Sequence, residues 1–249
     1  MRLTVDVWRQ DGPDDPGRLE RHQVGDATPE MSILELLDRL NDALVEDGCE
    51  PVAFESDCRE GICGACGVTV DGRPHGPAAN TPSCHQRLAS FRDGQQIRLE
   101  PLRSGAFPVL RDLVVDRSAL DRVITAGGHV GVRAGSAPDA DLVAVPHARA
   151  ELALDFAACT GCGACVAACP NGAAHLFLGA TLTHLALLPT AAIERGGRAA
   201  SMVQEAEQDF GPCSLYGECA DVCPAGIPLS AVAAVQKERL RSALRQRDD

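Results

Sequence analysis

The 249-residue sequence predicts an α+β fold, in which one helix crosses a small sheet in the first half and helices make up the second half. Alternation of apolar and polar residues, the period of a half-buried strand, is confined to the first half. The 12 cysteines form two groups, Cys49–Cys84 and Cys159–Cys223, with 74 cysteine-free residues between them. Long Ala- and Leu-rich segments with helical periodicity follow at 176–188, 191–208 and 228–246.

The first predicted elements form a hairpin. Leu3, Val5 and Val7 alternate with polar residues, which indicates a strand. The segment 11–17, rich in Gly, Pro and Asp, is typical of a turn, and residues 18–24 are expected to return as the partner strand. The hairpin thus supplies one edge of the sheet.

A helix with a clear start follows the hairpin. Ser32 stands three residues before Glu35, as in a capping box, and apolar residues then recur at helical spacing until Gly48. After the first cysteine group, residues 67–70 and 97–102 are short strand candidates. A helix lying across such a sheet is an α+β arrangement.

The change in character between the halves predicts two domains. We place the boundary near residue 118, which gives domains 1–118 and 119–249. The stretch 126–141, rich in Gly and Ala, is expected to be a surface or interface loop rather than a linker. The only internal repeat is the cysteine spacing itself.

Composition excludes several classes of function. Hydrophobic residues make up 45% of the chain, enough for a packed core. Acidic residues outnumber basic ones 35 to 23, and a formal net charge of −12 repels phosphate backbones, so nucleic-acid binding is not expected. The amino terminus shows no signal peptide, and no apolar stretch approaches the roughly 20 residues of a membrane span. In a reducing compartment, many cysteines indicate metal binding rather than disulfides.

The first cysteine motif has the plant-type spacing of a 2Fe–2S cluster. Its four members are Cys58, Cys63, Cys66 and Cys84. Because three thiolates must converge from one short segment, the chain has to curl around the cluster, and Gly61, Gly64 and Gly67 permit that close approach. Zinc is the alternative, but zinc sites usually pair two C-x2-C motifs, and this spacing differs.

The second motif has the spacing of bacterial ferredoxins, in which the fourth cysteine binds the other cluster of a pair. It consists of Cys159, Cys162, Cys165 and Cys169, followed by Pro170. An altered copy lies later in the chain: Cys213, Cys219 and Cys223-Pro224, with Tyr216 where a second cysteine would stand.

We call the motif at 159–169 and its altered copy at 213–223 the first and second runs. If the last cysteine of each run binds the cluster of the other run, the two clusters receive different numbers of ligands. A 4Fe–4S cluster receives Cys159, Cys162, Cys165 and Cys223. Three thiols remain for the other site: Cys169, Cys213 and Cys219. A cubane without a ligand at one corner readily lacks that iron, so we predict 3Fe–4S there, with Tyr216 packed over the cluster. The alternative is 4Fe–4S with a non-cysteine ligand or substrate at the open corner.

The remaining candidates are few. Cys49 is left over and is predicted to be a small, partly buried residue. The histidines show no catalytic or metal-site spacing, although His175 and His184 follow Cys169 closely enough to lie near the 3Fe–4S site. No catalytic residues are expected. Three clusters of different types make a one-electron relay, which predicts one subunit of a larger oxidoreductase.

In this order the motifs resemble the iron–sulfur subunits of succinate dehydrogenases and fumarate reductases, and the segment 58–64, Cys-Arg-Glu-Gly-Ile-Cys-Gly, is nearly the family signature. The resemblance implies a β-grasp ferredoxin domain followed by a helical ferredoxin domain. It implies a flavoprotein partner with covalent FAD that oxidises succinate, and a transmembrane anchor, with or without haem, that holds the chain at the cytoplasmic face of a bacterial membrane. Electrons would pass from FAD through 2Fe–2S, 4Fe–4S and 3Fe–4S to quinone, or in the reverse direction for fumarate reduction.

One difference between this sequence and part of the family concerns the type of quinone. Family members that reduce ubiquinone carry tryptophan shortly after the first Cys-Pro and histidine after the first cysteine of the second run. The corresponding segments here contain neither at those positions, and the only tryptophan is Trp8. The sequence therefore resembles the branch that commonly uses menaquinone. The residues expected around the 3Fe–4S site and its quinone are Pro170, His175, Ser214 and Tyr216.

Three other interpretations stay open. A free-standing electron carrier would need a polar exterior, whereas the stretch 176–188 is strongly apolar, as a core or a docking face would be. Iron–sulfur parts of glycerol-3-phosphate dehydrogenase or heterodisulfide-reductase relatives resemble the helical half but generally lack the plant-type loop. A structural zinc protein would be colourless.

Overall fold

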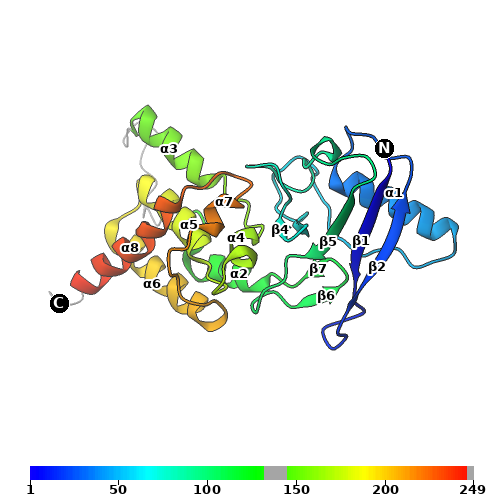
Figure 1. Ribbon diagram of the computed structural model, residues 1–249. Coiled ribbons are helices and arrows are strands. Elements are labelled where there is room, and N and C mark those ends of the chain that lie inside the picture. Colours follow the sequence, from blue (N-terminus) through cyan, green and yellow to red (C-terminus); the bar gives the residue numbers. More distant parts are fainter. Residues whose placement is uncertain (132–144, 246–249) are drawn as a thin grey trace.

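The computed structural model describes residues 1–131 and 145–245, with a sheet at one end and helices at the other (Figure 1). The five strands of the main sheet are β1 (Leu3–Arg9), β2 (Arg18–Val24), β3 (Val68–Val70), β4 (Arg73–Pro74) and β5 (Gln96–Pro101). Their order is β2-β1-β5-β3-β4, with β1 and β5 parallel and the other neighbours antiparallel. The predicted hairpin and both later strands are confirmed.

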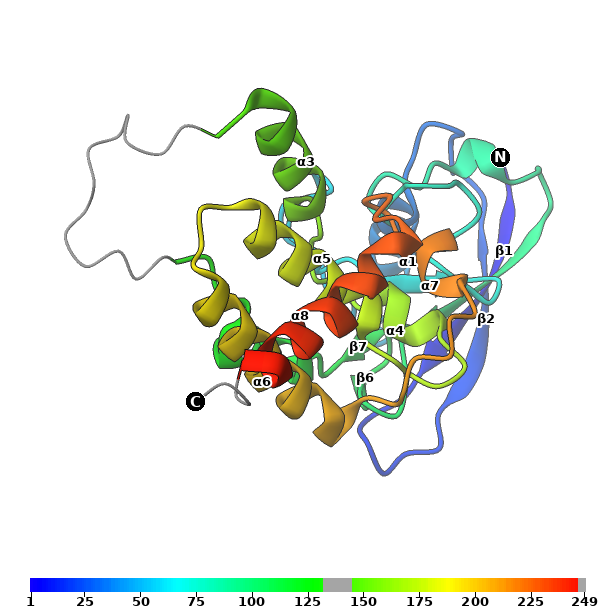
Figure 2. The ribbon, with the colours of Figure 1, turned by 90° about the vertical axis from the view of Figure 1, so that its left-hand side faces the viewer.

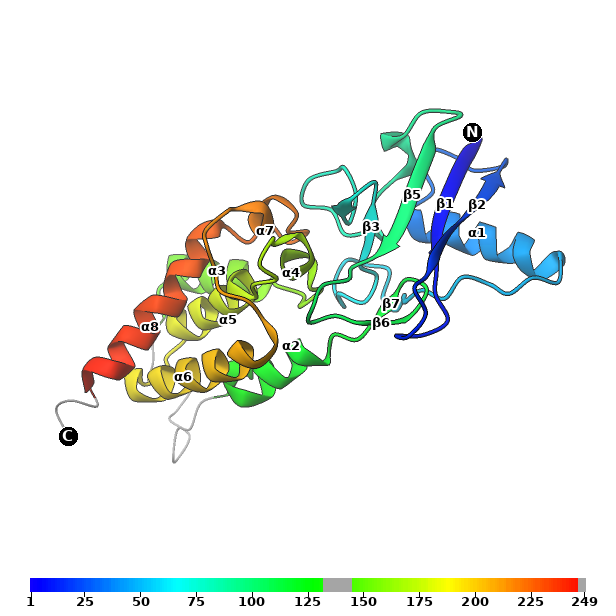
Figure 3. The same cartoon turned by 60° about the horizontal axis from the view of Figure 1, so that its bottom comes forward.

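Helix α1 (Ile33–Glu46) lies across this sheet (Figure 3). The capping box is confirmed: the Glu35 N–H donates to Ser32 Oγ at 3.2 Å, and the Ser32 N–H donates to the Glu35 carboxylate at 2.6 Å. The apolar face of α1 is buried with Val5 and Leu99 of the sheet in one core. Burial of that face against the strands fixes the helix in place.

The strands give way to helices near residue 118. A small hairpin, β6 (Val109–Arg111) and β7 (Val114–Val115), precedes α2 (Ser118–Val123) and a π-helical turn (Ile124–Gly128). Phe107, Val109 and Val115 nevertheless pack into the core of the helical half. The expected loop at 126–141 begins inside the π-helical turn, and most of the rest lies outside the described residues.

The helical half packs around three long helices. After α2 the described helices are α3 (His147–Ala157), α4 (Ala164–Ala168), α5 (His175–Leu187), α6 (Ala192–Asp209), α7 (Glu218–Asp221) and α8 (Val232–Arg245). Helices α5, α6 and α8 contact one another, and α3 packs on α5 (Figure 2). The three predicted helices correspond to α5, α6 and α8, the last preceded by a 3₁₀ turn at Leu229–Ala231.

The apolar stretch 176–188 is mainly core, because Leu176, Phe177 and Leu185 are buried. Helix α3 was not expected from the sequence; its buried residues are only Ala153 and Phe156, so its apolar pattern is weak. No helix within residues 1–131 and 145–245 is long and apolar enough to span a bilayer.

Candidate metal centres

The first cysteine loop presents backbone N–H groups to its sulfurs. Cys58 Sγ accepts hydrogen bonds from the N–H groups of Glu60, Ile62 and Cys63 at 3.3, 3.4 and 3.3 Å. These donors lower the pKa of the Cys58 thiol to about 7. The Ala65 N–H donates to Cys63 Sγ at 3.4 Å. The loop is thus built to stabilise negative charge on sulfur, as a ligating thiolate requires.

The other two thiols of this site lie deeper. Cys66 and Cys84 are buried, and burial, followed by the neighbouring charge of Cys84, raises the pKa of Cys66 to about 12. Gly61 and Gly64 adopt φ angles of +73° and +72°, the left-handed region that lets the loop curl. Gly67 lies outside that region; its missing side chain makes room for Leu102 instead.

One cavity of the helical half is lined by four thiols from both runs: Cys159, Cys162, Cys165 and Cys223. Leu176, Phe177 and Ile227 form its apolar walls. Burial raises the pKa of Cys159 to about 11, and burial also raises that of Cys165. Because buried thiols ionise only beside compensating positive charge, this donor set suits a metal cluster.

A second cavity is lined by the three remaining thiols of the two runs: Cys169, Cys213 and Cys219. Burial and then the nearby Cys169 and Cys213 raise the pKa of Cys219. The structure therefore brings Cys169 of the first run to cysteines of the second, and Cys223 to cysteines of the first.

The residues expected near the three-thiol cavity divide into two groups. His175, Ser214 and Tyr216 line it, and Ser214 Oγ also accepts a hydrogen bond from Asn171 Nδ2 at 2.9 Å. Pro170 is exposed and is absent from the described lining of this cavity. Tyr216 is 59% exposed, so it covers the cavity on its solvent side.

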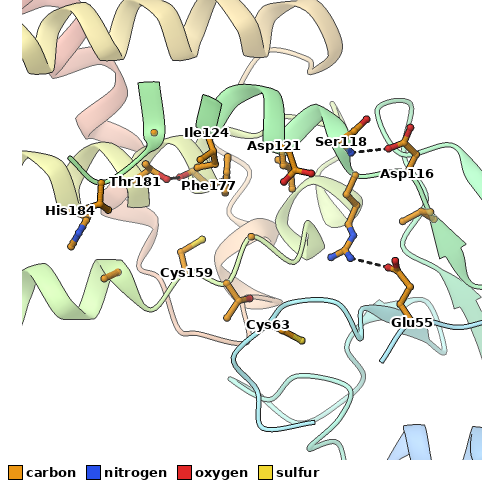
Figure 4. A pocket seen from close by; sticks show the side chains of 18 of the residues that line it. Glu55, Cys63, Asp116, Ser118, Asp121, Ile124, Cys159, Phe177, Thr181 and His184 are labelled. Carbon is orange, nitrogen blue, oxygen red and sulfur yellow. Dashed lines mark hydrogen bonds and ion pairs between the residues drawn. The ribbon is translucent and has the colours of Figure 1, made fainter. Parts of the chain in front are cut away.

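Two sequence-based placements were wrong. Cys49 is exposed just beyond the end of α1 rather than partly buried, since the chain leaves the core at Asp47. His184 lies far along α5 from Cys169, and its Nδ1–H donates to the Ala153 carbonyl at 2.8 Å. It lines the pocket between the two halves, where Cys63 and Cys159 also lie (Figure 4).

The donor geometry bears on the zinc alternative. The described cysteines are all free of disulfide bonds. No three Cys, His, Asp or Glu side chains within the described ranges are placed to hold a single metal ion. Thiols gathered around a cavity fit a multi-iron cluster, whose own sulfides lie between the ligands, better than a tetrahedral zinc site.

Two residues that sequence reasoning missed join the sites across the two halves. Arg117 Nη1 donates to the Gly64 carbonyl at 2.6 Å and, across the junction, to the Cys162 carbonyl at 3.4 Å. Its Nη2 donates to the Glu55 carboxylate at 2.9 Å (Figure 4). A Cβ at Gly64 would overlap the Thr160 carbonyl oxygen, so the two cysteine loops touch there. The other residue is His75, a buried histidine beside Cys162 with a pKa that burial lowers to about 4.

Comparison with known proteins agrees with this geometry. The family model described as a 2Fe-2S iron-sulfur cluster binding domain matches residues 4–122, and the 4Fe-4S dicluster domain matches residues 158–227. The fold and the two domains define an iron–sulfur protein with a 2Fe–2S domain and a 4Fe–4S domain.

Curated relatives narrow the class. The chain is 30% identical over 206 residues to the succinate dehydrogenase iron-sulfur subunit of Bacillus subtilis, covering 78% of this chain and 75% of the relative. It is 32% identical over 220 residues to the fumarate reductase iron-sulfur subunit of Mycobacterium tuberculosis, covering 87% and 83%. The chain belongs to the family of succinate dehydrogenase and fumarate reductase iron–sulfur subunits.

A solved structure shares the fold. The Mycobacterium smegmatis Sdh1 complex in the apo form contains a chain that superposes with a TM-score of 0.70 at 22% identity, covering 99% of this chain and 97% of that one. The predicted order of a sheet domain followed by a helical iron–sulfur domain is confirmed.

Proposed function

We propose that this chain is the electron-transfer subunit of a membrane-associated succinate:quinone oxidoreductase. The observation that carries the proposal is the division of eleven cysteines into three spatial groups, two of them crossed between distant segments. Chemistry on succinate would belong to a partner flavoprotein with covalent FAD. The same relay serves fumarate reduction when electrons flow the other way.

Each group is proposed to hold one cluster. The 2Fe–2S ligands are Cys58, Cys63, Cys66 and Cys84. The 4Fe–4S ligands are Cys159, Cys162, Cys165 and Cys223. The 3Fe–4S ligands are Cys169, Cys213 and Cys219. Together the clusters accept and release single electrons, and the chain supplies their ligands, burial and hydrogen bonds. We place the domain boundary at residue 118, where the strands have ended and α2 begins.

Contacts support the order of the relay. Gly64 of the first loop lies against Thr160, a residue that lines the four-thiol cavity. Leu176 lines both the four-thiol and the three-thiol cavity. The four-thiol site therefore neighbours each of the others, which supports its position in the middle of the relay.

Exposed side chains lie at both ends. Ile62, at the tip of the first loop, is 73% exposed, although it stands between two predicted ligands. Leu215 and Tyr216 at the three-thiol cavity are 65% and 59% exposed. Apolar groups in such positions are typical of surfaces that partners cover, so we assign the first to the flavoprotein and the second to a transmembrane anchor at the cytoplasmic face of a bacterial membrane.

The quinone is proposed to bind beside the three-thiol cavity. An adjoining cavity is lined by Glu207, Gln236 and Arg239. It shares His175 and Cys213 with the three-thiol cavity. Within the described residues, His175 Nδ1 is buried without a hydrogen-bond partner, and burial lowers the pKa of this imidazole. Together with Ser214 and Tyr216, His175 would line the approach of menaquinone, the quinone that the sequence pattern favours.

The proposal is tested by purifying the native complex and measuring succinate-driven reduction of menaquinone and ubiquinone analogues. The expected result is co-elution with a flavoprotein and faster reduction of the menaquinone analogue. A chain that elutes alone from size-exclusion chromatography of native extract would identify a free-standing carrier instead. Activity with ubiquinone analogues alone would overturn the choice of quinone.

A further inference from the structure

His75 holds an uncommon backbone position at the junction between the halves. It follows β4, its side chain is 2% exposed, and its φ angle of +64° lies in the left-handed region. Histidine enters this region more readily than most non-glycine residues, but a buried residue keeps it only where its surroundings hold it. The position of the ring therefore needs a structural reason.

Hydrogen bonds determine which ring nitrogen carries the proton. The Ser83 N–H donates to His75 Nδ1 at 3.1 Å, and Ser83 Oγ lies 2.9 Å from the same nitrogen. Ser83 Oγ in turn accepts from the Val68 N–H at 3.3 Å. Because a backbone N–H can only donate, Nδ1 is an acceptor, and the proton of the neutral ring resides on Nε2.

The protonated nitrogen faces a sulfur of the four-thiol cavity. His75 Nε2 lies 3.3 Å from Cys162 Sγ, across the junction from a different domain. Both residues are buried, and Cys162 packs in one apolar cluster with Leu102 and Ala164. Exclusion of water makes a hydrogen bond to a charged sulfur stronger than it would be at the surface.

We propose that His75 is a positioning residue of the 4Fe–4S site, whose Nε2–H donates to the Cys162 sulfur and raises the reduction potential of that cluster. This inference rests on the proposed ligand role of Cys162. A hydrogen bond to a ligating sulfur is stronger in the reduced, more negative state, so it favours reduction. Ser83 directly precedes Cys84, so the contacts of His75 with Ser83 and Cys162 also hold the first cysteine site against the four-thiol cavity.

Two substitutions of His75 distinguish the role of Nε2, which faces Cys162, from that of Nδ1, which faces Ser83. In His75→Asn, the shorter amide can replace Nδ1 towards Ser83, and asparagine tolerates the left-handed backbone, but nothing reaches Cys162. In His75→Gln, the longer amide can place an N–H where Nε2 stands. Arg73→Gln is the matched control, because Arg73 Nη2 donates across the same junction to the Asp221 carbonyl at 2.6 Å without touching a sulfur.

The readout is redox titration of each cluster by electron paramagnetic resonance in the purified complex. We expect His75→Asn to lower the equilibrium constant for one-electron reduction of the 4Fe–4S cluster about tenfold, or about 59 mV. His75→Gln should return most of that shift, Arg73→Gln should show none, and the 3Fe–4S potential should stay constant throughout. Loss of the 4Fe–4S signal in His75→Asn with its retention in His75→Gln would also support the donor role.

Other results overturn the inference. A fully occupied 4Fe–4S cluster at the wild-type potential in His75→Asn shows that the contact does not tune it. Equal loss of the cluster in the Asn and Gln variants reduces His75 to a packing residue. If the wild-type complex itself shows no 4Fe–4S signal, the ligand assignment of Cys162 fails, and the role of His75 fails with it.

Discussion

The first cysteine loop and the two cavities of the helical half build their sites in opposite ways. Three thiols of the first site come from the nine residues Cys58–Cys66, and one of them, Cys58, accepts three backbone N–H groups from that same segment. In the helical half each cavity combines thiols from two runs, and α5 and α6 occupy the chain between those runs.

This difference separates local from tertiary determination of a site. Short-range backbone geometry shapes the first cysteine loop, so a substitution in that loop should affect mainly its own site. The crossed sites exist only when α5, α6 and α8 pack and bring residue 169 to 213 and residue 223 to 159. Cluster binding in the helical half should therefore contribute to its folding free energy, as structural metals do in small domains.

The largest expected effect comes from breaking the crossing. Cys223→Ser should abolish the 4Fe–4S cluster, with a loss of about four irons per chain, although Cys223 lies in the second run. Cys219→Ser, only four residues away, is the matched variant and should remove the 3Fe–4S cluster while the 4Fe–4S signal persists. Iron analysis with electron paramagnetic resonance distinguishes them. Loss of the same cluster in both variants, with the other cluster retained, would show that the runs do not cross.

An intermediate effect is expected where the three-thiol cavity lacks a ligand. Tyr216 lines that cavity at the position of the missing cysteine. Tyr216→Cys should add a fourth thiolate and convert the 3Fe–4S centre to 4Fe–4S, a gain of about one iron. The oxidised 3Fe–4S signal should disappear. An unchanged signal would contradict the alignment of the two runs, and Tyr216→Phe serves as the control that adds no thiol.

The smallest effect tests the contact between the two regions. Gly64→Ala introduces a left-handed alanine, which costs roughly 1–3 kcal/mol, and a methyl group that overlaps the Thr160 carbonyl. Gly72→Ala is the matched control, because Gly72 has a φ of +80° but no atom within 4 Å of a new Cβ. Thermal unfolding should show a larger loss of stability for Gly64→Ala. An equal loss of stability in the two variants would mean that the close contact between Gly64 and Thr160 does not contribute to stability.

Patterns within one segment were the most predictable from sequence. The capping box at Ser32 and the strand pair at the amino end follow from neighbouring residues, and the structure confirms both. The cysteine groupings were expected from the spacing of two runs, and the structure brings the same thiols together around separate cavities. Their ligand roles remain proposals.

Residues that act across the junction were not predictable. His75 contacts the Cys162 sulfur and Arg117 the Cys162 carbonyl, over sequence separations of 87 and 45 residues, and no local pattern marks either side chain. The wrong placement of His184 near the three-thiol cavity has the same cause. Its position on α5 decides which cavity it lines, and its short sequence separation from Cys169 does not. The burial of Phe107 in the helical core likewise depends on packing between the halves.

The central claim is that eleven thiols hold three different iron–sulfur clusters. Its most direct test is iron analysis and electron paramagnetic resonance of anaerobically prepared complex. We predict about nine irons per chain, a 3Fe–4S signal in the oxidised sample and a 2Fe–2S signal that emerges on reduction. Bound zinc in place of iron, or an oxidised sample silent for 3Fe–4S, would contradict the account.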